Sequence, residues 1–374
     1  MIFLKILCEK SILQTAAANV SRAAASKSPV PAMEGILFEA RQGSLKLTAF
    51  DSKIGMYTFI EADVPQEGNV VLPARFLVDL LRRLPDGMMS IESDENLSVS
   101  IRCGRTEFHL IGLDPDSFPE LNVVNPRQTI RIPEGLLKSM INQTVFAVST
   151  SDSRPLYMGV LFEVGAGELT MVAIDGYRMA KRNEEIESGG MQPCSFIIPG
   201  TSLNEVERLC AADGKEEVVI ALGDKHASFS VGNTVLISRR LEGEFMNYRK
   251  SIPTSFRYEI IVEREEMIRV IDRVSLVIKE KQNSPVKMIV GDGILQFFCT
   301  TSFGHAEDVC ICEGSGEGMR IGFNDRYFMD ALKAANEEKL RISMNTPTAP
   351  IIIEAAEGGQ YLYMVLPVRL REGD

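Results

Sequence analysis

The stretch IRIPEGLLKSMINQTVFAVS, residues 130–149, combines a short strand with an amphipathic helix. Ile130 and Ile132 alternate with polar residues, and Pro133 removes a backbone donor where the helix is expected to begin. The apolar residues that follow share one helical face: Leu136, Leu137, Met140, Ile141 and Val145. The stretch therefore predicts a strand followed by a helix that is buried on one side.

The same pattern of apolar residues recurs along the whole chain. Six helical stripes start at Ile12, Phe76, Leu136, Ser202, Met267 and Tyr327, which lie 64, 60, 66, 65 and 60 residues apart. Between them the sequence alternates like strands, with a hairpin expected around Gln42-Gly43 and a last strand over 361–368. The segment GILFE (35–39) also resembles GVLFE (159–163). Repetition at a nearly constant period indicates an array of similar structural units.

The repeats predict an α+β chain of three similar domains, residues 1–127, 128–253 and 254–374. Each domain is expected to hold two helices packed against two antiparallel sheets. The helices are predicted over residues 11–23, 74–84, 134–148, 202–210, 264–278 and 325–336. An array with head-to-tail contacts either continues indefinitely or closes into a ring.

Composition places the chain among ordinary water-soluble proteins. It has 374 residues, 45% hydrophobic and 24% charged, with a formal net charge of −11. No apolar run approaches the roughly 18 residues that a membrane helix needs, and no secretory signal is recognisable. We expect a cytoplasmic protein without a membrane partner. The negative charge argues against a tight electrostatic grip on nucleic acid, unless charges are segregated between faces.

Enzymatic and metal-binding alternatives have little support in the residues. The seven cysteines are irregularly spaced, which fits a reducing compartment. Cys310 and Cys312, with His305 and Cys299 nearby, suggest zinc, but they lie in a strand-like alternation and lack a fourth ligand at finger spacing. The chain could also be a hydrolase that uses Asp175 with Arg178, or a Cys–His pair. The sequence shows no nucleophile elbow, phosphate loop or dinucleotide fingerprint to support that hypothesis. We expect no catalytic residue, cofactor or metal.

Several segments resemble the bacterial DNA sliding clamps, the beta subunits of DNA polymerase III. They are LPAR (72–75), LPDG (84–87), AIDGYRM (173–179), NYRKSIP (247–253) and MVLPVRL (364–370). The resemblance covers the whole chain. It implies a homodimer closed head to tail into a ring around double-stranded DNA, loaded by a clamp loader and tethering the replicative polymerase without catalysis. The alternative is a non-catalytic scaffold of the same fold, or a second clamp variant with a specialised role.

The resemblance also implies a hydrophobic cleft that binds short linear motifs of polymerase, clamp loader and repair proteins, with a glutamine-leucine-aromatic pattern. The matching positions are Arg154, Tyr157, Ile174, Gly176, Tyr177, Arg178, Met179, Met246, Lys250, Ser251, Pro350, Met364, Val365, Leu366, Pro367, Val368 and Arg369. Methionines suit an adaptable surface, and Arg178 and Lys250 are expected to hold the polar ends of a peptide. Burial in the last strand is the alternative role of Met364 and Leu366. Met246 replaces the family's usual proline, and Arg371–Asp374 extend beyond the usual end.

Two further sets of positions follow from the resemblance. The expected DNA contacts are Lys27, Arg75, Ser151 and Arg154, whereas residues 200–202 lack the basic residue that many relatives carry. The expected subunit interface joins Phe108 and Leu110 to Leu276 and Val277, with ordinary core packing as the alternative. Acidic residues are interleaved with the basic ones on the predicted helices, so any basic lining of the ring is expected to be mild.

Overall fold

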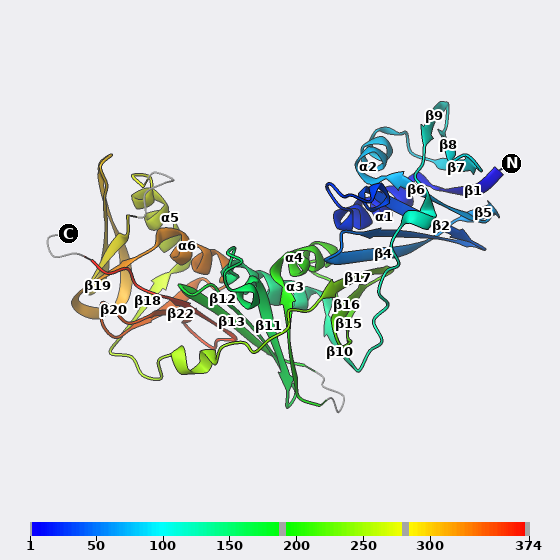
Figure 1. Cartoon of the computed structure of the whole chain (residues 1–374). Coiled ribbons are helices and arrows are strands. Elements are labelled where there is room, and N and C mark those ends of the chain that lie inside the picture. Colours follow the sequence, from blue (N-terminus) through cyan, green and yellow to red (C-terminus); the bar gives the residue numbers. More distant parts are fainter. Residues whose placement is uncertain (1, 187–191, 279–283, 371–374) are drawn as a thin grey trace. The chain divides into compact units, whose positions relative to one another are not determined.

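The computed structural model describes residues 2–186, 192–278 and 284–370 (Figure 1). By their contacts, the residues form two compact units. The first unit holds residues 1–138 and 204–240, and the second holds residues 139–203 and 241–374. Helices α3 (Glu134–Asn142) and α4 (Gly200–Leu209) contain two of the points at which the chain passes from one unit to the other.

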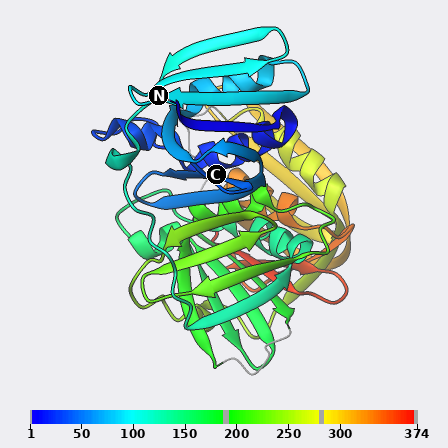
Figure 2. The ribbon, with the colours of Figure 1, turned by 90° about the vertical axis from the view of Figure 1, so that its right-hand side faces the viewer.

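The first unit contains two antiparallel sheets. A five-stranded sheet has the order β5 (Asp63–Gln66), β1 (Ile2–Glu9), β7 (Met88–Asp94), β8 (Ser98–Cys103) and β9 (Thr106–Ile111). Strands β7 to β9 lie next to one another in cyan in Figure 2. An eight-stranded sheet has the order β10 (Gln128–Pro133), β15 (Glu217–Leu222), β16 (His226–Val231), β17 (Thr234–Arg239), β4 (Ile54–Glu61), β3 (Ser44–Phe50), β2 (Gly35–Arg41) and β6 (Gly68–Pro73). The β17–β4 pairing joins segments about 175 residues apart, as Thr58 and Thr234 show by their hydrogen bond.

The second unit is organised around one ten-stranded sheet. Its order is β14 (Cys194–Pro199), β11 (Gly159–Gly165), β12 (Glu168–Ile174), β13 (Arg178–Glu185), β23 (Tyr361–Val365), β22 (Ile351–Ala355), β21 (Lys339–Met344), β18 (Tyr258–Glu263), β20 (His305–Phe323) and β19 (Val286–Thr300). The β13–β23 pairing places Met179 opposite Met364. Helices α5 (Arg264–Ser275) and α6 (Asp325–Ala334) contact each other, and α5 packs on β18, β19 and β20. Mixed helix and antiparallel sheet confirms the predicted α+β class.

The helices bury the predicted stripes, except at the first position of two of them. In α1 (Lys10–Val20), four of the five predicted stripe residues are buried: Leu13, Ala16, Ala17 and Val20. In α2 (Ala74–Arg83), Leu77, Leu80 and Leu81 are buried. Ile12 and Phe76, the first members of these stripes, are instead 47% and 46% exposed. Each stands at the margin of its stripe, because residues i+1, i+4 and i+5 already complete the face that meets the core.

Several predicted boundaries are wrong by a few residues. The helix expected over 134–148 ends at Asn142, where the Thr144 hydroxyl donates to the Met140 carbonyl at 2.8 Å, and a short 3₁₀ turn, Val145–Ala147, follows. The helix expected over 264–278 ends at Ser275. The last strand, expected over 361–368, ends at Val365, two residues before Pro367, which has no N–H to donate. Strands β1 and β5 were not predicted.

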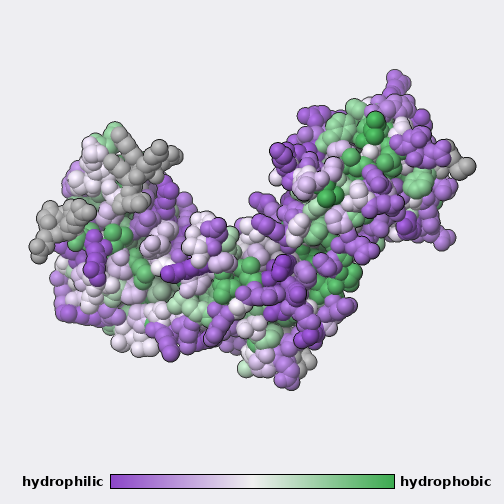
Figure 3. All heavy atoms as spheres, viewed as in Figure 1, coloured by the Kyte–Doolittle hydropathy of each residue, from purple (hydrophilic) through white to green (hydrophobic). Residues whose placement is uncertain are grey.

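The surface shown in Figure 3 is mostly hydrophilic, with scattered apolar side chains. Within the described ranges, no helix is long and apolar enough to cross a membrane. Nor do three or more His, Cys, Asp or Glu side chains in those ranges come together as a metal site. Cys310 and Cys312 are buried in β20.

Candidate functional site

A hollow of about 310 Å³ opens in the second unit, where β13, β23 and residues 246–251 meet. It is lined by Arg154, Tyr157, Ile174, Gly176, Tyr177, Arg178, Met179, Met246, Tyr248, Ser251, Pro350, Met364 and Leu366. Thus most of the residues expected in a cleft lie around one cavity. Tyr248 is the lining residue that sequence reasoning missed, although it stands inside the NYRKSIP segment.

The remaining expected cleft residues lie outside this lining. Val365 is 1% exposed and pairs with Arg178 and Ile351 in the sheet. The Val368 N–H donates to the Gly322 carbonyl at 2.8 Å, which ties the terminal segment to β20. Lys250 and Arg369 are exposed, and Pro367 is half-buried.

The floor of the hollow is part of a hydrophobic core. Ile174, Met179, Tyr248 and Met364 are buried together in one cluster. Met364 is 7% exposed, so it serves the core and lines the hollow at once. Leu366 follows the end of β23 and is 36% exposed, so a peptide can bury it further. Burying apolar area contributes roughly 25 cal/mol per Å², and this floor can therefore hold an apolar side chain.

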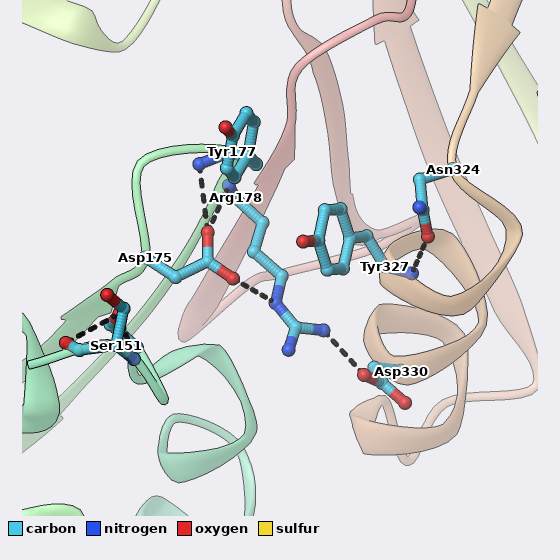
Figure 4. Close-up of polar contacts among 8 residues, drawn as sticks. Ser151, Asp175, Tyr177, Arg178, Asn324, Tyr327 and Asp330 are labelled. Carbon is cyan, nitrogen blue, oxygen red and sulfur yellow. Dashed lines mark hydrogen bonds and ion pairs between the residues drawn. The ribbon is translucent and has the colours of Figure 1, made fainter. Parts of the chain in front are cut away.

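A tight turn between β12 and β13 forms one side of the hollow (Figure 4). The Asp175 carboxylate accepts hydrogen bonds from the backbone N–H groups of Tyr177 at 2.8 Å and Arg178 at 3.0 Å. Gly176 has φ +96°, a region that residues with a side chain rarely adopt. The Leu366 N–H donates to the Tyr177 carbonyl at 2.8 Å. The turn therefore fixes the backbone at Tyr177, whose side chain is 63% exposed.

Arg178 is engaged by the protein itself. Its Nε donates to Asp175 Oδ2 at 2.9 Å, and its Nη1 donates to Asp330 Oδ2 at 2.5 Å (Figure 4). Its side chain is 11% exposed. Two carboxylates satisfy the charge of this guanidinium, which changes the expectation that Arg178 holds a polar end of a peptide.

The segment 246–251, which borders the hollow, is fastened through Glu163 on β11. The Tyr248 hydroxyl donates to Glu163 Oε2 at 2.6 Å, and Arg249 donates to both Glu163 oxygens at 3.0 and 2.7 Å. Burial, and then the hydrogen bond to Glu163, raise the pKa of Tyr248. One carboxylate thus holds two consecutive residues of the segment that borders the hollow.

We expect Glu163→Gln to lower the free energy of unfolding by about 1 kcal/mol, because the amide keeps an acceptor for Tyr248 but loses the bidentate pair with Arg249. Urea denaturation followed by circular dichroism measures the change. Glu185→Gln, at an exposed position of β13, is the matched control. Equal stability of the two variants would show that the Arg249 pair contributes nothing.

Aromatic and cationic side chains frame the outer rim. The Arg154 guanidinium lies 5.6 Å from the centroid of the Tyr157 ring, and Tyr157 meets Phe245 edge to face at 5.8 Å. Met246, in place of the family's usual proline, is 37% exposed. Ser151 and Ser153 share a hydrogen bond of 3.0 Å in the loop before Arg154. The rim is therefore polar above an apolar floor, as in small-ligand and peptide sites.

The expected DNA contacts are divided between the two units. Lys27 and Arg75 are exposed in the first unit, and Ser151 and Arg154 are exposed in the second. Most other basic residues of the helices have acidic partners. The pairs are Arg22–Glu205 at 3.1 Å, Lys138–Glu207 at 3.1 Å, Arg208–Glu205 at 2.6 Å, Arg269–Glu266 at 2.6 Å and Arg273–Asp308 at 2.6 Å.

The expected interface residues lie on exposed parts of each unit. Phe108, on the edge strand β9, is 37% exposed and Leu276, just after α5, is 77% exposed. Leu110 and Val277 are half-buried. Phe108 and Leu276 are thus too exposed for the alternative role as core residues.

Comparisons with known proteins match nearly the whole chain to one protein family. Family models of the DNA polymerase III beta subunit match residues 4–122 (N-terminal domain), 131–247 (central domain) and 249–369 (C-terminal domain). The chain is 32% identical to the beta sliding clamp of Bacillus subtilis, over 98% of this chain and 100% of that protein. It is also 32% identical to that of Halalkalibacterium halodurans, over 94% and 96%.

Solved structures extend this likeness. The crystal structure of the Bacillus subtilis DNA polymerase sliding clamp has a TM-score of 0.93 at 31% identity, covering 99% of this chain and 100% of that one. A DNA polymerase III beta subunit from Eubacterium rectale has a TM-score of 0.93 at 29% identity, covering 98% and 100%. A sliding clamp from Bartonella birtlesii, solved bound to griselimycin, has a TM-score of 0.92 at 28% identity, with the same coverage.

Proposed function

The chain belongs to the DNA polymerase III beta subunit family, the beta sliding clamps, which are non-catalytic processivity factors of DNA replication, and on this premise we propose how it assembles and binds. Two copies close head to tail into a ring that encircles double-stranded DNA. The hollow at Met364 is the docking cleft for linear motifs of the replicative polymerase, the clamp loader and repair proteins. Such a protein works in the cytoplasm, beside the chromosome.

Two exposed strand edges support the ring. β9 is the last strand of the five-stranded sheet and β19 is the last strand of the ten-stranded sheet, so each has an unpaired edge. Ile111, at the end of β9, is 78% exposed, and Ile311, on β20 opposite Ile294 of β19, is 79% exposed. Exposed apolar edges favour pairing with another chain, and one edge at each end of the chain suits a head-to-tail contact. We also propose that the chain divides into three domains, with boundaries after residues 127 and 253.

A loose hold on DNA suits a ring that slides. Non-specific binding rests on Lys and Arg side chains that neutralise phosphates, and it weakens with salt. In this chain three basic side chains on or next to the helices, Arg22, Lys138 and Arg273, each pair with an acidic side chain. Lys27, Arg75 and Arg154 are exposed and supply the phosphate contacts in our proposal.

The observation that carries the docking proposal is the hollow itself, with its buried apolar floor and half-exposed Leu366. An apolar peptide side chain enters the floor between Met364 and Tyr248, while the polar rim contacts the peptide backbone. Aromatic and aliphatic anchors that fill such pockets provide most of the affinity in peptide complexes. The glutamine-leucine-aromatic pattern supplies these anchors.

Fluorescence anisotropy of a labelled peptide with this pattern tests the docking cleft. We expect saturable binding by the full chain and at least a tenfold loss for Met364→Ala with Leu366→Ala, because each truncation removes about 1 kcal/mol or more of contact. Val123→Ala, at a residue 82% exposed in the first unit, is the control. Circular dichroism verifies that each variant is folded. Undiminished binding by the folded double variant would place the peptide elsewhere.

A further inference from the structure

Arg178 occupies a slot made from segments of the second unit that are far apart in the sequence. Two carboxylates contact its guanidinium: Asp175 lies 2.9 Å from Nε and Asp330 lies 2.5 Å from Nη1. The first carboxylate is three residues away in the sequence, whereas Asp330 is 152 residues away on α6. A planar guanidinium with two carboxylate partners is held in one orientation.

Two aromatic rings lie next to the same guanidinium. Arg178 Cζ lies 4.5 Å from the Tyr327 ring centroid and 5.5 Å from that of Phe146. Tyr327 and Asp330 are three residues apart on α6, so they share one face of that helix. The Asn324 side chain accepts the Tyr327 N–H at 3.1 Å and caps the helix (Figure 4). α6 therefore presents a ring and a carboxylate together to Arg178.

The slot connects directly to the rim of the cleft. The Tyr177 ring lines the hollow and stacks on the Tyr327 ring, with centroids 6.1 Å apart and planes inclined by 20°. The backbone of Tyr177 is already fixed by Asp175 and Leu366, so the stacking decides mainly where its ring points. Asp330 does not line the hollow, but it contacts Arg178, which does.

We propose that Asp330 is a positioning residue of the docking cleft: by holding Arg178 against Tyr327, it keeps the Tyr177 ring stacked in the orientation that receives a peptide. The proposal rests on the proposed docking function. Without Asp330, Arg178 keeps Asp175 alone and can turn within the slot, and Tyr177 gains rotational freedom that a peptide must then remove. Ordering a side chain during association lowers affinity without changing the fold.

The simplest alternative is that the Arg178–Asp330 pair is a surface ion pair of little consequence. The Asp330 side chain is 43% exposed, and exposed pairs often contribute almost nothing. Against this, the Arg178 side chain is 11% exposed and stacked on aromatic rings, so its guanidinium has few other positions. The alternative predicts no change in the cleft, and the two can therefore be distinguished.

The test measures peptide affinity and the environment of residue 177 separately. In the anisotropy assay we expect Asp330→Asn to bind the peptide about fivefold to tenfold more weakly, or up to about 1.4 kcal/mol, and Asp330→Glu to recover most of the loss. Asp325→Asn, with the same charge change on the same helix, is the matched control. The chain contains no Trp, so Tyr177→Trp introduces a single fluorophore at the rim. We expect its emission to shift to longer wavelength when Asp330→Asn is added.

The outcomes separate this inference from the docking proposal. The positioning role is overturned if Asp330→Asn binds the peptide as tightly as the parent and does not shift the emission of Tyr177→Trp. That result leaves the docking proposal intact. Equal losses in Asp325→Asn and Asp330→Asn would also overturn it, because any charge loss on α6 would then suffice. No binding by the folded parent overturns docking itself. If Asp330→Asn fails to fold, Arg178→Lys replaces it, because lysine cannot bridge both carboxylates; unchanged affinity in that variant counts against the proposal.

Discussion

We expect Leu276→Asp to convert the proposed dimer into monomers at micromolar concentration. Leu276 is 77% exposed in the isolated chain and is buried at the proposed subunit interface. Placing an unpaired carboxylate in an apolar contact costs several kcal/mol. A two-fold ring contains the interface twice, so the substitution weakens both contacts between the subunits. Analytical ultracentrifugation measures the change directly. We expect a dissociation constant at least a hundredfold higher.

The control for this variant must carry the same change at another exposed apolar residue. Val123→Asp meets this need, since Val123 is 82% exposed and is not part of β9. We expect it to remain dimeric. A Leu276→Asp protein that stays dimeric would place the interface on another surface. A parent chain that is monomeric at the same concentration would remove the ring from the proposal.

The second large effect is a loss of stability in alkaline solution. Tyr248, Tyr361 and Tyr363 are 1%, 3% and 0% exposed, and burial is the main cause that raises the pKa of each. Burial also raises the pKa of Cys8 and of Cys210 to about 12 and that of Cys310 to about 11. Each group therefore favours its neutral form in the folded chain.

The sign of the effect follows from proton linkage. Because the folded pKa values lie above the unfolded ones, the contribution of these groups is complete below the pKa of an unfolded thiol, about 8.5. It decreases as the pH rises through the interval between the two pKa values. Each group then costs about 1.4 kcal/mol per pH unit. Urea denaturation at several pH values from 7.5 to 11 measures the slope.

Tyr363→Phe isolates one of these groups. The Tyr363 hydroxyl is buried and lacks a hydrogen-bond partner within the described residues, so its removal is expected to cost little at pH 7.5. The phenylalanine variant should lose less stability than the parent between pH 10 and 11. If the stability of the parent does not fall up to pH 11, water reaches these tyrosines and thiols in the folded state.

The sequence by itself determined the repeated pattern of this protein. The six helices begin within two or three residues of the starts that apolar spacing predicts, because helix faces follow from the period of 3.6 residues. Alternation around Gly43 predicts the β2–β3 hairpin for the same local reason. The AIDGYRM and MVLPVRL segments, through their resemblance, also indicated most of the residues that line the hollow.

Tertiary structure alone decided how distant residues are used. The sequence near Arg178 does not predict its ion pair with Asp330, because the pair depends on where β13 and α6 lie after folding. Tyr248 is a core residue because folding packs it beside Ile174 and Met364, where its hydroxyl donates to Glu163 of β11 at 2.6 Å. Ile12 and Phe76 were left exposed because their neighbours filled the face that meets the core. Local periodicity records which face of an element is apolar; long-range contacts depend on the path of the whole backbone, which no short stretch of sequence contains.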